Sequence, residues 1–194
     1  SPDYRTEFAN DLKKMLPRIP LVDSADDFWN FSKAGRELAD LHINYEEVDP
    51  HPDVLITLRD DKILKVDNMR FPSKDERPDL ENVDSGDHTF KVNKMKFPAK
   101  DQKDTIIYNG GIKLTNIPLE AYNYVVNGKS AIEWIMERYQ VKVDKKSEIK
   151  NDPNDWSQEV GNPRYILDLL LSIINVSVKT VDIVNSLPKL EFEE

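Results

Sequence analysis

The fold of this chain is decided by residues 105–115, which read TIIYNGGIKLT. Thr105–Tyr108 and Ile112–Thr115 are rich in the β-branched and aromatic side chains that favour strands. Asn109-Gly110-Gly111 separates the two runs, and an Asn-Gly step between apolar segments is a strong signal for a tight turn. The stretch therefore predicts an antiparallel β-hairpin.

Short strand patterns precede this hairpin, and helical patterns lie on both sides of the strand-rich region. The further strands are predicted at Val54–Leu58, Ile63–Phe71 and Thr89–Phe97. Helices are predicted at Pro2–Leu16, Ser24–His42, Pro118–Val125, Ser130–Tyr139 and from Asn162 to Pro188. We therefore expect an α+β fold with N-terminal helices, a central antiparallel sheet and C-terminal helices.

We expect residues 1–194 to form one domain with three parts. These are a helical lead-in over residues 1–47, a β-rich region over 54–117 and C-terminal helices over 118–188. The residues between 144 and 156 are rich in turn formers and are predicted as a loop. The last helix has an apolar stripe that predicts its buried side, formed by Ile166, Leu169, Leu170 and Ile173.

The composition excludes several kinds of site. Hydrophobic residues make up 39% and charged residues 32% of the 194 residues, which is the balance of a globular chain. There is no cysteine, so disulfides, thiolate metal sites and cysteine nucleophiles are excluded. No apolar run approaches the ~20 residues that span a bilayer, and the N-terminus has no signal-peptide pattern. We therefore expect a cytoplasmic location and no membrane partner.

The net charge of −9 restricts how the chain can bind nucleic acid. Binding by charge favours a basic domain, because positive side chains neutralise the phosphates. An acidic chain needs a local concentration of positive charge for this purpose. Such a concentration lies between Thr89 and Ile117, where six lysines and two aspartates give a local charge of +4.

An internal repeat lies in the same part of the chain. Lys65–Pro72 recurs as Lys91–Pro98, with five of eight positions identical. In an extended strand, the methionine and phenylalanine of each copy share one face, and the basic or amide residues next to them share the other. The candidate DNA contacts are therefore Lys65, Asn68, Arg70, Lys91, Asn93, Lys94, Lys96 and Lys100.

Two interpretations of the repeat stay open. A two-stranded ribbon can enter the major groove of DNA, where Arg or Lys reads guanine and Asn or Gln reads adenine. Alternatively, these side chains only solvate the open face of an antiparallel sheet. Residue spacing by itself favours the second interpretation.

The sequence contains no complete active site. Gly128-Lys129-Ser130 resembles the end of a phosphate-binding loop, but Asn123 stands where that motif needs its first glycine. We interpret Ser130 as a helix cap instead. No second ligand stands at metal spacing from any of the histidines, which are His42, His51 and His88. We therefore predict no catalytic residue, no metal site and no cofactor in these residues.

Several longer segments resemble one family of restriction–modification enzymes. The segments are Tyr4–Phe8, Leu16–Pro20, Ala34–His42, Tyr45-Glu46, Asn127–Trp134 and Asn151–Trp156. In this order they are similar to the C-terminal specificity domain of the type ISP enzymes, and the similarity covers nearly the whole chain. Glu148 is a departure, because it stands where the resemblance implies a glycine.

The resemblance implies a function in DNA target recognition. It implies a parent protein with a nuclease, an ATP-dependent helicase-like motor and an adenine-N6 methyltransferase, which uses S-adenosylmethionine, ATP and magnesium. None of the motifs of those parts is present in these residues, so we expect no enzyme activity here. The expected partners are double-stranded DNA and the upstream methyltransferase and motor domains of the same chain. The alternative is a protein-interaction or scaffolding module that docks on those upstream domains.

Overall fold

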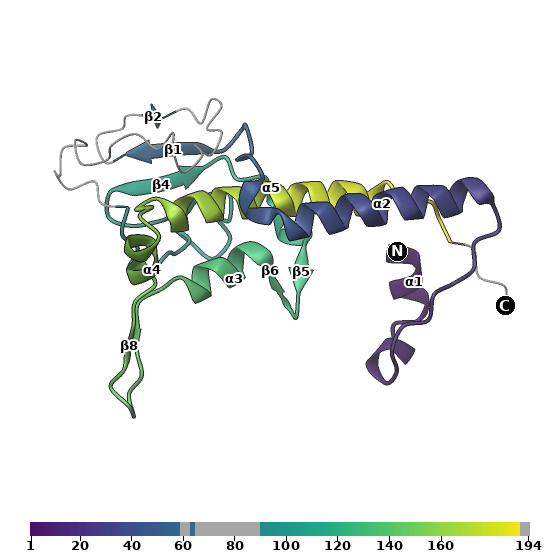
Figure 1. The fold of residues 1–194 in the computed structure, drawn as a ribbon, viewed down its shortest axis with the longest axis horizontal. Helices are drawn as coiled ribbons and strands as arrows, with labels where there is room; N and C mark the ends of the chain where they lie inside the picture. The colour runs from purple at the N-terminus through teal and green to yellow at the C-terminus, as the bar shows by residue number, and fades with distance from the viewer. Residues whose placement is uncertain (59–62, 65–89, 191–194) are drawn as a thin grey trace. The chain divides into compact units, whose positions relative to one another are not determined.

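The computed structural model describes residues 1–58, 63–64 and 90–190 (Figure 1). The chain divides into two compact units. The first, here called the terminal unit, is Ser1–Asn44 with the C-terminal residues from Lys179, and the second, the central unit, is Tyr45–Val178. Helices together with small antiparallel sheets confirm the predicted α+β class. The three predicted parts of the chain stay a prediction.

The central unit contains a four-stranded antiparallel sheet with the strand order β2-β1-β4-β3. The predicted hairpin of β3 and β4 is confirmed, with Ile106 opposite Leu114. Its β4 strand also pairs with β1, from Leu55 opposite Thr115 to Leu58 opposite Ile112. The strands are β1 (Leu55–Leu58), β2 (Ile63–Leu64), β3 (Ile106–Ile107) and β4 (Ile112–Thr115).

Asn109 builds the turn between β3 and β4. Its side-chain oxygen accepts hydrogen bonds from the backbone N–H groups of Gly111 and Ile112, both at 2.8 Å. Its side-chain nitrogen donates to the carbonyl oxygen of Lys91 at 3.0 Å. The residue that predicted the turn therefore satisfies the donors of the turn and also holds the segment that precedes it.

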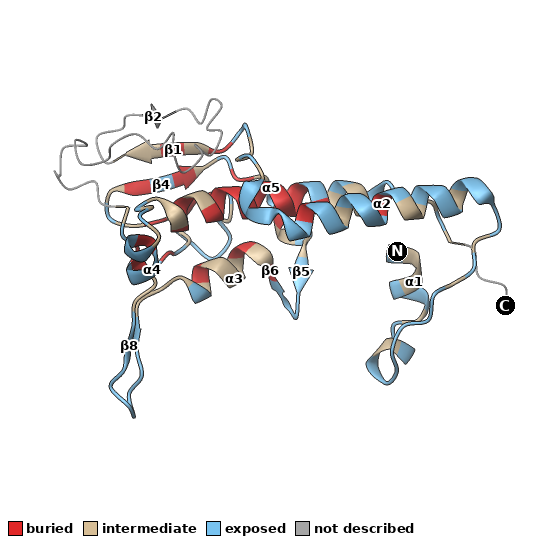
Figure 2. Ribbon diagram, in the orientation of Figure 1, coloured by how far each residue is buried: buried red, intermediate tan, exposed pale blue. Residues whose placement is uncertain are grey.

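Helix α5 (Tyr165–Asn185) supplies the largest part of the core. The four residues of the predicted stripe are buried, and so are Leu167, Leu171 and Ile174 on the other sides of the helix (Figure 2). A helix that is apolar on every side is an interior helix. The prediction of a single buried stripe was therefore too narrow.

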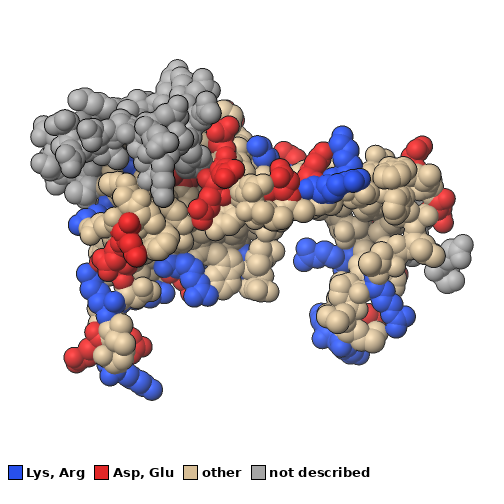
Figure 3. All heavy atoms as spheres, in the orientation of Figure 1, with Lys and Arg blue, Asp and Glu red and all other residues tan. Residues whose placement is uncertain are grey.

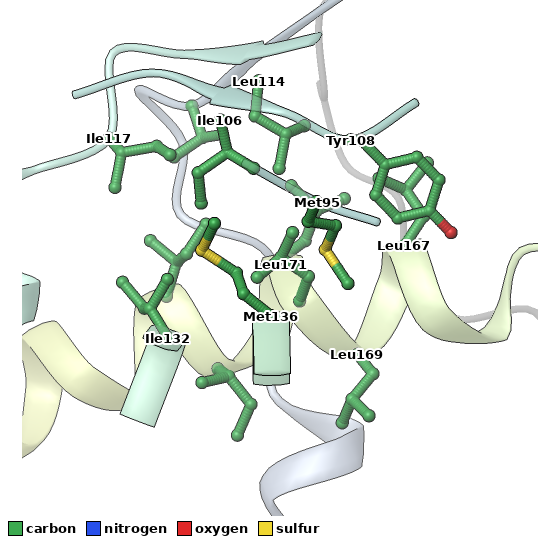
Figure 4. Close-up of a cluster of buried hydrophobic side chains, with 14 of the residues drawn as sticks. Met95, Ile106, Tyr108, Leu114, Ile117, Ile132, Met136, Leu167, Leu169 and Leu171 are labelled. Atoms are coloured by element: carbon green, nitrogen blue, oxygen red, sulfur yellow. The ribbon is translucent and has the colours of Figure 1, made fainter. Parts of the chain in front are cut away.

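The core joins α5 to the sheet and to α3 (Ala131–Arg138), as Figure 4 shows. Each of the three elements contributes a fully buried side chain: Leu114 from the sheet, Ile132 from α3 and Leu171 from α5. Tyr108 is also fully buried, and its hydroxyl donates to the carbonyl oxygen of Phe90 at 2.8 Å. The buried phenol therefore has the partner that burial of a polar group requires.

The predicted helix at residues 118–125 is present only as the short 3-10 helix η4 (Leu119–Asn123). The chain then forms a hairpin of β5 (Val125–Val126) and β6 (Lys129–Ser130). Asn127 and Gly128 take φ angles of 50° and 84°, which suit the two-residue turn of such a hairpin. Turn chemistry therefore ends the helix early.

The helix predicted from Ser130 is confirmed as α3. Ser130 Oγ accepts from the backbone N–H of Glu133 at 3.2 Å, and the Glu133 carboxylate accepts from the Ser130 N–H at 3.1 Å. This reciprocal pair is a capping box. Burial raises the pKa of Glu133, but hydrogen bonds from Lys103 and Ser130 outweigh burial and hold it below its ordinary value.

The predicted loop between residues 144 and 156 contains regular structure instead. It forms a hairpin of β7 (Lys142–Val143) and β8 (Lys150–Asn151), followed by helix α4 (Asn154–Glu159). In Figure 1 this hairpin extends away from the rest of the central unit. The turn-forming residues were correctly recognised, but they close a hairpin and begin a helix.

The terminal unit begins with α1 (Pro2–Glu7) and η1 (Asp11–Lys13), where one helix was predicted. The break allows the chain to fold back, so that the backbone N–H of Arg18 donates to the Tyr4 hydroxyl at 2.9 Å. The second predicted helix is confirmed as α2 (Ala25–Ile43), with Ser24 Oγ accepting from the Asp27 N–H at 3.0 Å. Within this unit, His42 Nε2 lies 2.9 Å from Thr180 Oγ1.

Asn154 holds the segment around Val92 by two hydrogen bonds to its backbone. Its side-chain oxygen accepts from the Val92 N–H at 2.9 Å, and its side-chain nitrogen donates to the Val92 carbonyl at 2.8 Å. Both residues are buried. A side chain here takes the place of a neighbouring strand, and satisfies backbone groups that would be costly to bury unpaired.

We predict that Asn154→Ala lowers the free energy of unfolding by roughly 2–6 kcal/mol, because two buried backbone groups lose their partner at about 1–3 kcal/mol each. Thermal or urea unfolding of the variant measures this loss. Asn151→Ala, at an exposed position of the same residue type, is the control and should change stability little. Equal stability of the two variants would show that the Asn154 hydrogen bonds are not important.

Candidate nucleic-acid interface

The predicted DNA contacts fall into two groups. Lys65, Asn68 and Arg70, in the first copy of the repeat, lie outside the described residues. The second group is described, and all of its members are exposed: Lys91, Asn93, Lys94, Lys96 and Lys100. The pairing of the two copies as one ribbon therefore stays a prediction.

The strand predicted at residues 89–97 is wrong for the described residues 90–97. They make only one β-bridge, in which Lys96 and Ile107 exchange backbone hydrogen bonds of 3.1 and 2.9 Å. The physical reason is competition for the backbone. Asn154 takes both backbone groups of Val92, and the carbonyl of Asn93 accepts from the Val141 N–H at 2.8 Å.

The predicted alternation of side chains nevertheless holds in this segment. Met95 is 3% exposed, Phe97 is half-buried, and Lys94 and Lys96 point outward. Among the described residues, no carboxylate forms an ion pair with Lys91, Lys94, Lys96 or Lys100. We call the exposed side chains of residues 91–100 the basic segment.

Lys103 adds less positive charge to this surface than the sequence count implies. Its ammonium group lies 3.0 Å from the Glu133 carboxylate and over the rings of Phe97 and Tyr122, at 5.8 and 5.2 Å from their centroids. These contacts match its partial burial. Lys103 therefore holds α3 against the neighbouring segments, which is a structural role.

A second basic region lies along α3. The ring of Trp134 is contacted by Lys129 at 5.1 Å and by Arg138 at 5.4 Å from its centroid. Glu137 lies among these cations, and the hydrogen bond from Lys129, with the charges of Lys142 and Arg138, lowers its pKa. Three cations around one carboxylate leave this surface with a positive balance.

The β7–β8 hairpin begins beside the basic segment, because Val141 directly precedes it and is bonded to Asn93. All its residues from Lys142 to Asn151 are exposed. In Figure 3, Lys and Arg side chains are visible at the tip of this hairpin and near its base, together with acidic side chains. The hairpin lysines were not among the predicted contacts. The paired lysines at 145 and 146, within a turn-rich stretch, were the available signal.

The histidine and acidic side chains of the described residues do not form a cluster of metal ligands. No group of three or more His, Asp or Glu side chains in residues 1–58 and 90–190 is placed to hold a metal ion. His51 Nδ1 accepts from the Asp53 N–H at 3.3 Å, and His88 lies outside the described residues. Lys129 belongs to the β5–β6 hairpin and forms an ion pair with Glu137, which is not the setting of a phosphate-binding loop.

No helix in the described residues has both the length and the apolar character needed to cross a membrane. The described residues present two kinds of exposed surface. The central unit offers basic side chains, and the terminal unit exposes large apolar ones, of which Ile19 and Leu21 are 95% and 97% exposed.

Comparison with solved structures shows three similar proteins that are described together with DNA. A nuclease-deletion mutant of the Type ISP restriction–modification enzyme LlaGI, in complex with a DNA substrate mimic, is 44% identical with a TM-score of 0.77. The ATP-dependent Type ISP enzyme LlaBIII bound to DNA is 39% identical with a TM-score of 0.78. The DrdV–DNA complex is 27% identical with a TM-score of 0.68.

The alignments cover nearly all of this chain and a small part of the others. They cover 100% of this chain with LlaGI and LlaBIII and 98% with DrdV, but only 15%, 10% and 17% of those chains. A search of curated proteins found no match. The family model described as the Type ISP C-terminal specificity domain matches residues 1–169. This chain belongs to the Type ISP C-terminal specificity domain family.

Proposed function

We propose that this domain recognises duplex DNA in a sequence-specific manner and positions it for adenine-N6 methylation and ATP-dependent restriction by other parts of a larger protein. The observation that carries the proposal is the basic segment, whose lysines are exposed and have no acidic partner among the described residues. The similar enzymes LlaGI and LlaBIII, which are described with DNA, support it.

The acidic net charge is compatible with this function if different parts of the parent protein make the phosphate contacts and the base contacts. Phosphate contacts supply most of the affinity for DNA, whereas base contacts supply specificity. We propose that the rest of the parent protein makes most of the phosphate contacts. The domain, with its net charge of −9, then adds a small number of local contacts.

The contacts proposed in this domain are those of the repeat. Lysine side chains can read guanine or neutralise phosphates, and asparagine can read adenine. The proposed residues are Lys91, Asn93, Lys94, Lys96 and Lys100 in the basic segment, with Lys65, Asn68 and Arg70 outside the described residues.

Enzyme activity is assigned to the parent protein. We propose that its other parts carry a nuclease, a helicase-like motor and a DNA adenine methyltransferase, and that they bind magnesium, ATP and S-adenosylmethionine. We propose that this domain contributes DNA recognition to those reactions.

We predict that Lys94→Ala and Lys96→Ala leave the melting temperature of the domain unchanged and weaken DNA binding by the full-length protein. A lost base contact costs ~1–3 kcal/mol and relaxes specificity at one position. A lost phosphate contact weakens binding to all sequences. It also reduces the salt slope, which is the steepness with which the logarithm of affinity falls with the logarithm of salt concentration, by roughly one. Affinity at several salt concentrations and methylation of a site library measure both effects.

The control for these variants is Lys179→Ala, which removes an exposed lysine of the terminal unit. It should preserve affinity and sequence preference. Binding and methylation unchanged in Lys94→Ala and Lys96→Ala would mean that the basic segment only solvates the surface.

We also predict that the purified domain neither hydrolyses ATP nor cleaves or methylates DNA. Lys129 is the residue to test, because its sequence context resembles a phosphate loop while its ammonium group pairs with Glu137. Release of phosphate from ATP is measured for the wild-type domain and for Lys129→Ala. Hydrolysis that requires magnesium and is lost in the variant would contradict the assignment.

A second candidate function is docking on the upstream domains, and the terminal unit supports it. A groove of about 900 Å³ is lined by apolar residues that include Tyr4, Leu21, Phe28 and Phe31. Ile19 and Leu21, which also line this groove and are almost fully exposed, offer apolar contact surface to a protein partner. Pro17 and Pro20 restrict the backbone beside it, which lowers the entropy that docking must remove.

We propose that the methyltransferase part of the parent protein covers this groove, because this chain corresponds to a small fraction of the length of similar enzymes. The two functions are compatible, since one uses apolar side chains of the terminal unit and the other uses basic side chains of the central unit.

We predict that Leu21→Asp leaves the melting temperature of the isolated domain unchanged but speeds proteolytic release of the domain from the full-length protein by about tenfold or more. Burying a leucine contributes roughly 1.5–3 kcal/mol, and the aspartate loses it. Leu119→Asp, at another exposed leucine, is the control. The same release rate in both variants would show that the groove is not a docking surface.

A further inference from the structure

The β7–β8 hairpin has a defined turn although it is fully exposed. Asp144 Oδ1 accepts hydrogen bonds from the backbone N–H groups of Lys146 at 2.9 Å and Ser147 at 2.8 Å. The hydrogen bond from Ser147 has the larger effect and that from Lys146 the next, and both lower the pKa of Asp144 and favour its charged form. The Glu148 N–H donates back to the Asp144 carbonyl at 2.9 Å. The turn is therefore set by its own hydrogen bonds, without support from a core.

The charges of the hairpin differ between its base and its tip. At the base, Lys150 pairs with Asp152 at 2.8 Å, and this partner raises the pKa of Lys150. At the tip, Lys145 and Lys146 have no acidic partner among the described residues. The Asp144 carboxylate already accepts the bonds of the turn. The tip therefore presents two exposed lysines that form no ion pair with a described residue, beside the Asp144 and Glu148 carboxylates of the same turn.

The base of the hairpin is attached to the basic segment. The Val141 N–H donates to the Asn93 carbonyl, and Asn154, which follows the hairpin, binds both backbone groups of Val92. The hairpin and the basic segment are consequently one connected surface. The hairpin therefore starts beside residues that are proposed to contact DNA.

We propose that the β7–β8 hairpin is a second DNA contact, in which Lys145 and Lys146 neutralise backbone phosphates next to the site that the basic segment contacts. This inference rests on the proposed function. Its occupant is DNA because the tip presents two exposed lysines without an ion pair to a described residue, carries no apolar side chain, and belongs to a hairpin that starts beside the basic segment. A two-stranded ribbon also has the width that the major groove admits.

A protein partner is the other kind of occupant for an exposed hairpin. Val143 and Ile149 are 58% and 67% exposed and lie below the tip. They are single apolar side chains on a surface of charged ones, whereas a protein interface has an apolar centre. The observations therefore favour DNA, and the variant Val143→Ser with Ile149→Ser tests the alternative.

Salt dependence of DNA binding by the full-length protein is the decisive measurement. The double variant Lys145→Ala with Lys146→Ala should lower the salt slope by about two, because each phosphate contact contributes about 0.9. The ratio of wild-type to variant affinity should then fall about tenfold between 50 and 200 mM salt. The matched control, Lys179→Ala with Lys189→Ala, removes two exposed lysines of the terminal unit and should keep the slope.

Glu148 allows a gain of binding to be tested. Its φ angle is 57°, a left-handed conformation that glycine adopts more easily. Glu148→Gly keeps the turn and removes a negative charge beside the tip lysines, so affinity should increase at low salt. Glu120→Gln, which removes an exposed carboxylate elsewhere in the central unit, should have a smaller effect.

The outcomes separate this inference from the proposed function. Absence of specific DNA binding by the wild-type protein would overturn the proposed function. Normal binding by the wild type, with an unchanged salt slope in the tip variant, would overturn the hairpin contact alone. Equal losses in the tip variant and the lysine control, or a change in sequence preference without a change in slope, would overturn it as well. A loss of binding confined to Val143→Ser with Ile149→Ser would assign the hairpin to a protein contact.

Discussion

Enclosure of α5 by apolar side chains is the constraint on which the central unit depends. Leu167, Leu170 and Ile174 lie on different sides of the helix and are all buried. Such a helix needs packing partners around it, and the sheet and α3 contribute to the same core. Because the interior is occupied by apolar side chains, the lysines of the central unit are left on segments at its surface.

The segment from Phe90 to Phe97 shows how this core and the surface are connected. Val92 and Met95 enter the core, while the lysines between and beside them stay in solvent. Its backbone is held by Asn154 and Val141 and not by a full strand ladder. Basic side chains are thereby presented from a fixed backbone, which would reduce the entropy lost in the proposed contact with DNA.

The two proposed surfaces explain how an acidic domain can act on DNA. The terminal unit exposes an apolar groove, suited to a protein partner that brings its own phosphate contacts. The central unit exposes the basic segment and the lysine-tipped hairpin, suited to DNA. Association through the groove would raise the effective concentration of DNA at weak basic contacts. A strongly basic domain is then unnecessary.

Local patterns in the sequence determined the class of the fold, the β3–β4 turn at Asn109, the caps at Ser24 and Ser130, and the outward side chains at Lys94 and Lys96. Each of these depends on residues within a few positions of one another, so composition and periodicity reveal them. Tertiary structure alone decided that Asn154 replaces a strand partner for Val92, because that contact joins residues 62 positions apart. It also decided that α5 is buried on every side along its first part, from Ile166 to Val178. Burial and backbone pairing between distant segments settle these features, and no local pattern records them.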